Sequence, residues 1–314
     1  MATSIANLAQ LARTELGSVV VGHADALETL FITILCGGHA LLEGVPGLGK
    51  TLAVRTLART LSISYRRVQC TPDLMPADIT GSTIWNATAS EFRVHEGPIF
   101  TDLLLVDEIN RMPPRTQAAL LEAMEERQVT LDGVPRPLSP LFTVVATQNP
   151  VEFEGTYPLP EAELDRFAVK ITMGYPDAAE ETAILERYQA VGEMPSAAQR
   201  GVIGAQDLAD ARAEGSRVRV EPALLGYVAA IARQTRDWPA VALGASPRAA
   251  IHLLQLAKAL AAVDGRDYLL PDDVKRVAPA ALRHRLVVRG EADLEGVTPD
   301  QVIADVLASV PVPK

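Results

Sequence analysis

Residues 44–51 read Gly-Val-Pro-Gly-Leu-Gly-Lys-Thr, and they restrict what this chain can fold into more than any other stretch. Every fixed position of the phosphate-loop pattern G-x-x-x-x-G-K-S/T is present. An apolar run at 39–42 precedes the loop as a predicted strand, and a helix is predicted from Lys50 through Leu61. A strand, a glycine-rich loop and a helix in this order predict a binding site for a nucleoside triphosphate.

The chemistry of a phosphate site explains the spacing of these residues. Glycines let backbone N–H groups approach a phosphate without a side chain in the way, and the start of a helix adds partial positive charge. Lys50 is expected to reach the β- and γ-phosphates, and the Thr51 hydroxyl is expected to ligate Mg²⁺. The predicted nucleotide contacts are Gly44, Val45, Pro46, Gly47, Leu48, Gly49, Lys50, Thr51 and Leu52.

Polar residues stand at the ends of two further apolar runs. Asp107 and Glu108 follow the run at 103–106, and Asn149 follows the run at 141–147. In a doubly wound parallel sheet, ligands bind at the carboxyl ends of the strands, so these side chains should meet the phosphate loop. Asp107 is predicted to hold Mg²⁺, and Glu108 to orient or deprotonate the attacking water. Asn149 could hydrogen-bond the γ-phosphate or that water.

The bulk composition argues against some functions. The formal charge is −10 at pH 7, and general binding to nucleic acid or to an acidic membrane requires a basic face. Cys36 and Cys70 lie outside any C-x-x-C or His-rich cluster, which is typical of buried thiols in a reducing compartment. No apolar run reaches the roughly 18 residues that span a bilayer, and the N-terminus lacks a signal-peptide pattern. We therefore expect a cytoplasmic protein.

The pattern of predicted elements changes after Pro176. Upstream, apolar runs alternate with helical segments, which predicts an α/β domain over residues 1–174, a parallel sheet sandwiched by helices. Downstream, helices are predicted over 180–191, 206–214, 222–235, 247–263 and 271–285. No strand is predicted among them, so residues 175–314 are expected to form a second, all-helical domain.

Two hairpins are predicted to interrupt the α/β pattern. Residues 82–86 and 91–95 are typical of two short strands around a polar turn, and Gly97-Pro98 closes the segment. Asp132-Gly133 lies between alternating residues, which is a signal for a tight hairpin turn. The first hairpin is a candidate contact element for another molecule.

Four segments together resemble the MoxR type of AAA+ ATPases. They are the phosphate loop, Leu-Leu-Leu-Val-Asp-Glu-Ile-Asn-Arg at 103–111, Ala-Thr-Gln-Asn-Pro at 146–150, and Glu-Gly-Thr-Tyr-Pro-Leu-Pro-Glu-Ala-Glu-Leu-Asp-Arg-Phe at 154–167. The last segment is far more specific than a phosphate loop alone, and the resemblance extends over nearly the whole chain. It implies an AAA+ nucleotide-binding domain followed by a helical lid, with Walker A in the phosphate loop and Walker B at Asp107 and Glu108.

The resemblance also implies roles for two arginines. Arg166 is similar to the arginine finger, which acts on the nucleotide of a neighbouring subunit, so a ring, usually a hexamer, is implied. Arg248 resembles the sensor 2 arginine of the lid. Plainer interpretations stay open: Arg166 could pair with Asp165 or Glu163, and Arg248 could be a solvated side chain at the start of a helix.

Other assignments carry less specific support. Asn149 is similar to sensor 1 of the family, and Val21 and Gly22 are candidates for contact with adenine. Arg111 and Arg115 could also face the nucleotide of a neighbour.

Known family members act as chaperone-like motors with von Willebrand A-domain partners. The resemblance therefore implies ATP and Mg²⁺, a protein client and such a partner. The segments at 81–97 and 129–137 resemble the helix-2 insert and the pre-sensor-1 hairpin. Our leading hypothesis is a Mg²⁺-dependent ATPase that remodels a protein. An ATP-switched binding scaffold, a metal-chelatase-type motor subunit and a nucleic-acid translocase are alternatives, and the acidic balance argues against the last of them.

Overall fold

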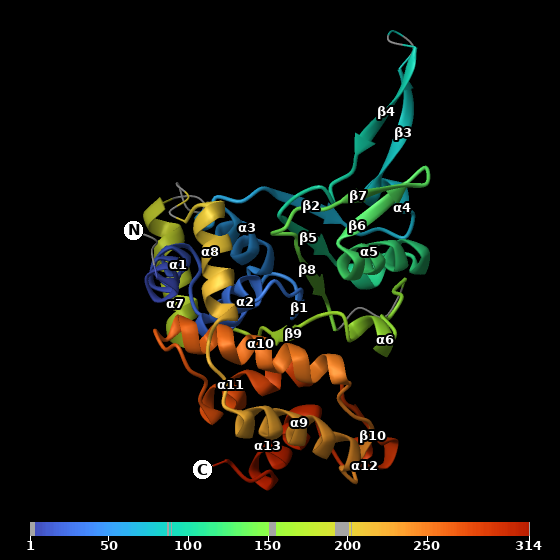
Figure 1. Cartoon of the computed structure of the whole chain (residues 1–314). Helices are drawn as coiled ribbons and strands as arrows, with labels where there is room; N and C mark the ends of the chain where they lie inside the picture. The colour runs from blue at the N-terminus through green and yellow to red at the C-terminus, as the bar shows by residue number, and fades with distance from the viewer. Residues whose placement is uncertain are drawn as a thin grey trace.

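A parallel sheet with helices on both faces forms the upper part of the molecule in Figure 1, and a group of helices forms the lower part. This computed structural model describes residues 4–86, 88, 90–150, 155–191, 201 and 203–313. The arrangement confirms the expected fold class, an α/β sheet followed by a helical C-terminal region. Over those described ranges, no helix is both long and apolar enough to cross a membrane. Glu154, the first residue of the most specific family segment, lies outside them.

Five parallel strands form the sheet, in the order β2-β5-β8-β1-β9. Because all five run the same way, their carboxyl ends meet at one edge, where ligands of such sheets bind. The central strands are buried along almost their whole length, which explains why they are continuous apolar runs in the sequence. The strands are β1 (Ala40–Glu43), β2 (Tyr65–Gln69), β5 (Leu103–Asp107), β8 (Thr143–Gln148) and β9 (Val169–Thr172).

Successive residues of the strands point to opposite faces of the sheet and pack into two separate cores. Leu103, Leu105 and Val145 belong to one core, whereas Leu104 and Val144 belong to the other. The first core also contains apolar side chains of the C-terminal helices. The sheet and the C-terminal region are therefore held together by a shared apolar interior.

The helices of the α/β region divide between the two faces. Those that pack into the first core are α1 (Ile5–Val19), α2 (Ala24–Leu35), α3 (Lys50–Thr60) and, from further along the chain, α8 (Ala205–Ser216). The opposite face is covered by α4 (Pro76–Thr80) and α5 (Pro114–Glu126). Pro114 occupies the first turn of α5, where proline is common because the N–H that it lacks would have no partner within the helix.

Both predicted hairpins are confirmed. The first consists of β3 (Gly81–Asn86) and β4 (Glu91–Glu96), and Figure 1 shows it projecting away from the rest of the molecule. The second consists of β6 (Gln128–Leu131) and β7 (Val134–Pro137). Its turn residues Asp132 and Gly133 have φ angles of 51° and 77°. Two consecutive positive φ angles are what a tight hairpin turn with Asp-Gly requires.

The C-terminal region is mostly helical, but the expectation that it contains no strand was wrong. Two short strands, β10 (Val241–Leu243) and β11 (Val287–Val288), pair antiparallel beside the helices. Strands of three and two residues are too short to show an alternating pattern in the sequence. Besides α8, the helices described in this region are α7 (Ala178–Val191), α9 (Pro222–Asp237), α10 (Pro247–Val263), α11 (Pro271–Leu282), α12 (Gly290–Leu294) and α13 (Pro299–Ser309). The sequence analysis did not predict α12 and α13.

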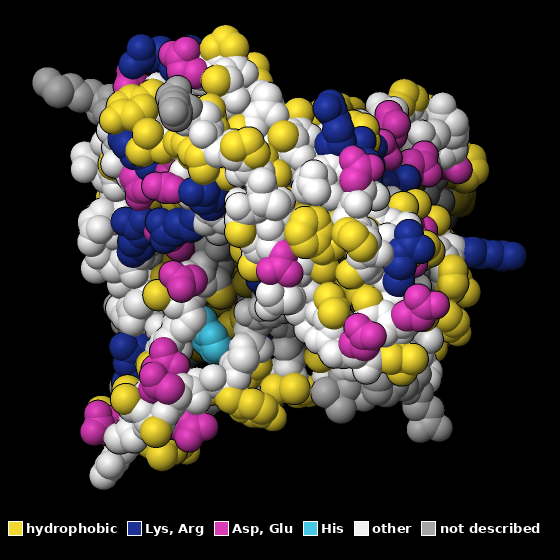
Figure 2. All heavy atoms as spheres, turned by 90° about the horizontal axis from the view of Figure 1, so that it is seen from below, with side chains coloured by type: hydrophobic (Ala, Val, Ile, Leu, Met, Phe, Trp, Pro, Cys, Tyr) yellow, Lys and Arg dark blue, Asp and Glu magenta, His cyan; other side chains and the backbone are white. Residues whose placement is uncertain are grey.

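The surface of the C-terminal side carries both signs of charge. Figure 2 shows this face from below, with Lys and Arg side chains scattered among Asp and Glu side chains. A nucleic-acid-binding face typically gathers basic residues into one patch or stripe. The mixed charge of this face agrees with the argument from net charge against a nucleic-acid translocase.

Candidate nucleotide site

The phosphate loop lies between the carboxyl end of β1 and the first turn of α3. Gly47 and Gly49 have φ angles of 87° and 78°, in the left-handed region that favours glycine. At Gly44 the constraint is space, because a Cβ atom there would lie 2.7 Å from the carbonyl oxygen of Met173. Lys50 Nζ donates to the carbonyl oxygen of Gly44, which keeps the ammonium group in the loop. The loop therefore has the backbone shape that its sequence predicted.

Asp107 stands at the carboxyl end of β5 and faces the loop. Its Oδ2 accepts a hydrogen bond from Thr51 Oγ1 at 3.3 Å, and its Oδ1 accepts one from Thr147 Oγ1 at 2.5 Å. A threonine hydroxyl beside a carboxylate is a set of oxygen donors that suits Mg²⁺. The residues present here therefore fit the metal that the sequence analysis assigned to Thr51 and Asp107.

Arg67 on β2 is a neighbour of Asp107 that sequence reasoning missed. Its Nη2 lies 2.5 Å and its Nε 3.2 Å from Asp107 Oδ2, and Nη2 also donates to Gln69 Oε1 at 2.6 Å. Gln69 is paired in register with Asp107 on the adjacent strand. Val68 of β2 is buried, so Arg67 and Gln69 on either side of it point to the opposite face of the sheet, but an exposed arginine on a strand gives no distinctive sequence signal.

Glu108 follows Asp107 and has an unusual backbone. Its φ and ψ are 60° and 52°, a left-handed conformation that is uncommon for a residue other than glycine and is often found at functional sites. The side-chain Oε2 accepts from Gln69 Nε2 at 3.0 Å and from Arg111 Nη1 at 3.3 Å. Its backbone N–H donates to Thr147 Oγ1 at 2.9 Å. Three neighbours thus position Glu108 beside the phosphate loop, where its carboxylate could act on a water molecule.

One cavity of about 440 Å³ brings most of the predicted residues together, but Gly44 and Val45 are not among the residues described in its lining. Asn149 is buried at the end of β8 and joins them, as its position after an apolar strand predicted. Arg55 and Thr147 are two further lining residues that the sequence analysis did not single out. The lining comprises Pro46, Gly47, Leu48, Gly49, Lys50, Thr51, Leu52, Arg55, Asp107, Glu108, Thr147 and Asn149.

Val21 and Gly22 line a different cavity, of about 430 Å³. It lies among α1, α2 and α7 and is largely apolar, with Leu16, Leu27 and Phe31 in its wall. Among the residues described for each cavity, the lining shares no member with that of the phosphate cavity. The structure therefore gives the two residues an apolar surface but does not join them to the phosphate loop in one cavity.

Arg166 and Arg248 meet at the edge of the sheet opposite to the phosphate loop. Arg166 follows α6 (Glu161–Leu164) and precedes β9, and Arg248 lies in the first turn of α10. Both line a polar cavity of about 330 Å³ together with His39, which precedes β1. Four residues of β1 separate this edge from the loop, and at about 3.3 Å per residue that is roughly 13 Å. The two arginines are brought together, but apart from the phosphate site of their own chain.

The pairing of Arg166 differs from the plain alternative considered from the sequence. Its Nε lies 3.1 Å from Glu125 Oε2 on α5. Asp165 is instead held by Arg285, whose Nε donates to Asp165 Oδ1 at 2.8 Å, and by Ser246 Oγ at 2.9 Å from both carboxylate oxygens. Burial lowers the pKa of Arg285 to about 10, and the charge of Asp165 opposes that shift. Residues from the C-terminal region thus fix the backbone that carries Arg166.

His39 should make the stability of the fold depend on pH. Burial lowers the pKa of its imidazole to about 3, whereas the unfolded chain titrates near 6.5. Below pH 6.5 the unfolded state therefore binds more protons, and stability falls as the pH falls. At pH 5 the loss from His39 is expected to be about 2 kcal/mol in the free energy of unfolding.

Urea unfolding at pH 7 and pH 5, for the wild type and His39→Asn, measures this contribution. Asparagine keeps an acceptor for the Val144 N–H, which donates to His39 Nδ1 at 2.9 Å, but it does not titrate. The variant should lose less stability between the two pH values than the wild type, by about the amount above. An equal loss in both proteins would show that His39 does not carry the effect.

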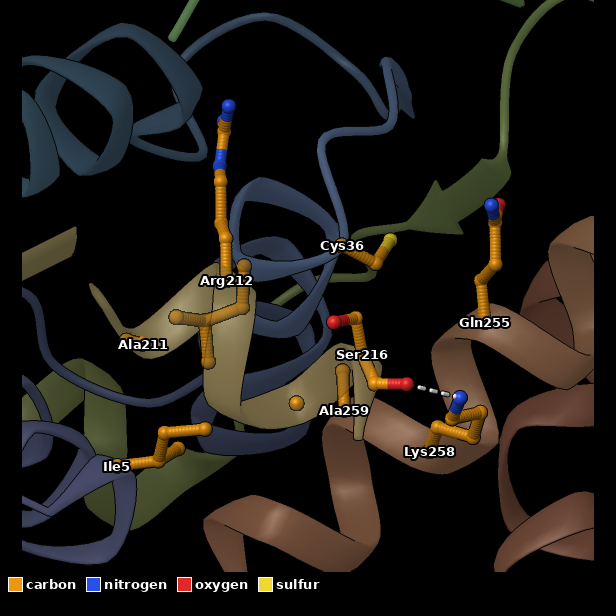
Figure 3. Close-up of a pocket in the computed structure, with 10 residues that line it drawn as sticks. Ile5, Cys36, Ala211, Arg212, Ser216, Gln255, Lys258 and Ala259 are labelled. Carbon is orange, nitrogen blue, oxygen red and sulfur yellow. Dashed lines mark hydrogen bonds between the residues drawn. The ribbon is translucent and has the colours of Figure 1, made fainter. Parts of the chain in front are cut away.

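A smaller pocket, of about 200 Å³, lies next to the arginine cavity (Figure 3). The two share Cys36 and Gln255. Lys258 Nζ donates to the carbonyl oxygen of Ser216 at 2.5 Å, and Arg212 donates to backbone carbonyl oxygens and to a threonine hydroxyl on the sheet side. Burial raises the pKa of the Cys36 thiol to about 11, which keeps it unreactive. These polar groups join α8 to α10, to α2 and to the start of β8, and the residues described in the lining include none of the predicted site residues.

Comparison with known proteins agrees with this geometry. The family described as the ATPase family associated with various cellular activities (AAA) matches residues 39–169, and the AAA lid domain matches residues 233–306. Protein YeaC of Bacillus subtilis, itself uncharacterised, is 44% identical over 94% of this chain and 92% of its own length. Chaperone MoxR1 of Mycobacterium tuberculosis is 42% identical over 96% of this chain and 81% of its own length.

A solved structure gives the same result for the fold. The crystal structure of a candidate ATPase from Cytophaga hutchinsonii matches with a TM-score of 0.91 and 42% sequence identity, over 99% of this chain and 96% of the other. Similarity of this extent, over most of the length of each relative and with a cavity lined by the glycine-rich loop at the expected edge of the sheet, shows that the chain belongs to the MoxR family of AAA+ ATPases.

Proposed function

We propose that this ATPase hydrolyses ATP with Mg²⁺ at the interfaces of a ring of identical subunits, and that the ring is a hexamer, as the family resemblance implies. One observation carries the proposal: Arg166 and Arg248 lie together at the edge of the sheet opposite to the phosphate loop of their own chain. In a head-to-tail ring, opposite edges of neighbouring subunits face each other. The arginines of one subunit would then reach the nucleotide of the next.

Five residues of the phosphate cavity have a role in this proposal. Lys50 binds the β- and γ-phosphates, and Thr51 and Asp107 hold Mg²⁺, which would neutralise phosphate charge when bound. Glu108 orients and deprotonates the attacking water, and Asn149 hydrogen-bonds the γ-phosphate or that water. These are the side chains that line the carboxyl edge of the sheet, within one cavity.

The two arginines act on charge that develops during hydrolysis. A guanidinium group near the γ-phosphate stabilises the transition state, and such arginines supply large rate effects in other phosphoryl-transfer proteins. Arg166 is the primary candidate because the Asp165 network fixes its backbone. Arg248 accompanies it from the C-terminal region. Since Arg248 lies outside the phosphate cavity of its own chain, we propose that it also acts on the neighbour's nucleotide.

The proposal also includes a site for the adenine base and a boundary between two domains. We assign adenine to the apolar surface that includes Val21 and Gly22, at the end of α1. We also divide the chain into a nucleotide-binding domain at 1–174 and a lid at 175–314. The shared apolar core implies that the lid moves little against the first face of the sheet within one subunit.

We propose that the protein uses its ATPase cycle to remodel other proteins. MoxR1 of Mycobacterium tuberculosis, at 42% identity, is named a chaperone, and we propose the same class of activity for this protein. We also propose that it acts in the cytoplasm and that its partner is a von Willebrand A-domain protein.

The β3–β4 hairpin is the proposed contact with the client protein. Trp85 and Phe92 are opposite each other on its two strands, with ring centroids 5.0 Å apart. Their exposed fractions of 54% and 72% leave a bare aromatic surface, which is typical of a binding site.

Replacing both aromatics with serine, Trp85→Ser and Phe92→Ser together, should abolish client protection without changing basal ATP hydrolysis. The reason is that the hairpin projects away from the sheet and from the phosphate cavity. Light scattering of thermally unfolding citrate synthase measures protection, and phosphate release measures hydrolysis. Val134→Ser, at a 52% exposed residue of the second hairpin, is the matched control. Unchanged protection by the double variant would contradict the assignment of the hairpin.

A further inference from the structure

A single carboxylate lies between the two arginines of the polar cavity. Glu125 stands in the last turn of α5. Its Oε2 is 3.1 Å from Arg166 Nε, and its Oε1 accepts a hydrogen bond from Arg248 Nη2. Each oxygen therefore takes one arginine, and the three residues come from three elements that are distant in the sequence.

The cavity has an excess of positive charge around this carboxylate. Arg127 also lines the cavity, but its guanidinium donates hydrogen bonds to two backbone carbonyl oxygens, those of Gly37 at 2.6 Å and Phe142 at 3.3 Å. The imidazoles of His39 and His252 are neutral at pH 7, since burial lowers both pKa values to about 3. Of the residues described in the lining, only Glu125 can balance Arg166 and Arg248.

The side chains of the two ion pairs are partly exposed. The side chains of Arg166, Arg248 and Glu125 keep 27%, 39% and 37% of their surface exposed. Ion pairs with this exposure are screened by solvent and are individually weak. A terminal phosphate carries more negative charge than a carboxylate and offers three oxygens, and arginine binds phosphate in a two-pronged geometry. A phosphate that enters the cavity should therefore displace Glu125 from both arginines.

We propose that Glu125 is the resident counter-ion of Arg166 and Arg248, which holds both side chains in the free subunit and competes with the phosphate of a neighbour's nucleotide for them. This rests on the proposed action of the arginines across a subunit interface. Glu125 is a positioning residue, because it holds the two arginine side chains close together. It is also inhibitory, because both ion pairs must break before the arginines can bind the ATP of a neighbouring subunit.

Removal of this charge should make ATP-dependent assembly easier. In a Glu108→Gln background, which keeps ATP intact, Glu125→Gln should lower the protein concentration at half-assembly about three- to tenfold, as expected for the loss of two exposed ion pairs. Sedimentation velocity over a dilution series with ATP and Mg²⁺ measures that concentration. The same series with ADP should show no shift, because ADP lacks the γ-phosphate that competes for the arginines.

Two control proteins separate this role from a structural one. Glu126→Gln removes the same charge from the next residue of α5, which is exposed and outside the cavity lining, and it should leave the half-assembly concentration unchanged. Glu125→Gln should also have no effect once Arg166 and Arg248 are both alanine, because the competing groups are gone. A structural role of Glu125 would act in that background too.

The outcomes distinguish this inference from the function on which it rests. If the Glu108→Gln protein assembles with ATP, and Glu125→Gln leaves the half-assembly concentration unchanged or raises it, the counter-ion role is wrong and the ring remains. If no concentration of the Glu108→Gln protein assembles with ATP, the proposed ring is wrong, and the competition that Glu125 is proposed to exert is wrong with it.

Discussion

Glu108→Gln should reduce ATP hydrolysis about 10²–10⁴-fold and leave nucleotide binding intact. The carboxylate of Glu108 stands at the phosphate cavity, and three neighbours position the residue. Glutamine has the same size, and its side-chain oxygen can still accept from Gln69 and Arg111, but an amide cannot take a proton from water. Binding should survive because the loop residues, Thr51 and Asp107 are unchanged.

Phosphate release and titration with a fluorescent ATP analogue measure the two effects separately. Glu126→Gln, a charge change on an exposed side chain of α5, should leave both at the wild-type level. Hydrolysis within a few-fold of wild type in Glu108→Gln would contradict the assignment of the general base.

The same variant distinguishes a motor from an ATP-switched scaffold. A motor loses protection of citrate synthase when hydrolysis stops, whereas a scaffold keeps or strengthens partner binding. The chain of contacts from Asp107 through Arg67 and Gln69 to Glu108 ties the two acidic residues together.

Arg166→Ala should lower the rate of hydrolysis about 10³–10⁵-fold at saturating ATP, a range set by arginine fingers in other proteins. Its guanidinium lies at the amino edge of the sheet, roughly 13 Å of strand away from the loop of its own chain. Loss of the side chain should therefore leave the nucleotide affinity of the isolated subunit unchanged. The effect should fall on turnover, because the arginine contacts the nucleotide only across an interface.

Steady-state hydrolysis over a range of ATP and protein concentrations tests this expectation. Arg219→Ala is the matched control, since Arg219 forms an exposed pair with Asp267 in the C-terminal region. That control should hydrolyse ATP like the wild type. A loss of ATP affinity in dilute Arg166→Ala, rather than a loss of turnover, would contradict action across an interface.

Local patterns in the sequence were enough to predict that polar side chains gather at the glycine-rich loop. The glycines of the loop, the apolar run before Asp107 and the Asp-Gly turn at 132–133 each act over a few neighbouring residues. Backbone conformation and strand direction then determine how these segments meet, because parallel strands bring their carboxyl ends together. Asp107, Glu108 and Asn149 therefore line one cavity with the loop, as the sequence indicated.

Contacts between distant segments could not be predicted in the same way. Arg248 reaches Glu125 across 123 positions, and Arg285 reaches Asp165 across 120. Such pairs depend on how the C-terminal helices pack against the sheet, and no local pattern encodes that packing. The edge residue Arg67 was overlooked for a different reason, since one exposed arginine on a strand has no distinctive sequence signal.

The direct test of action across subunits is to mix two inactive variants. Glu108→Gln subunits bind ATP and supply Arg166, while Arg166→Ala subunits supply Glu108. Equal amounts are combined without nucleotide, ATP and Mg²⁺ are added, and phosphate release is measured. If Arg166 serves the neighbour's site, random mixing should restore about a quarter of the wild-type rate, because about half of the sites and half of their neighbours are intact. If the mixture forms joint assemblies and its rate stays at the sum of the two variants, the central claim is wrong.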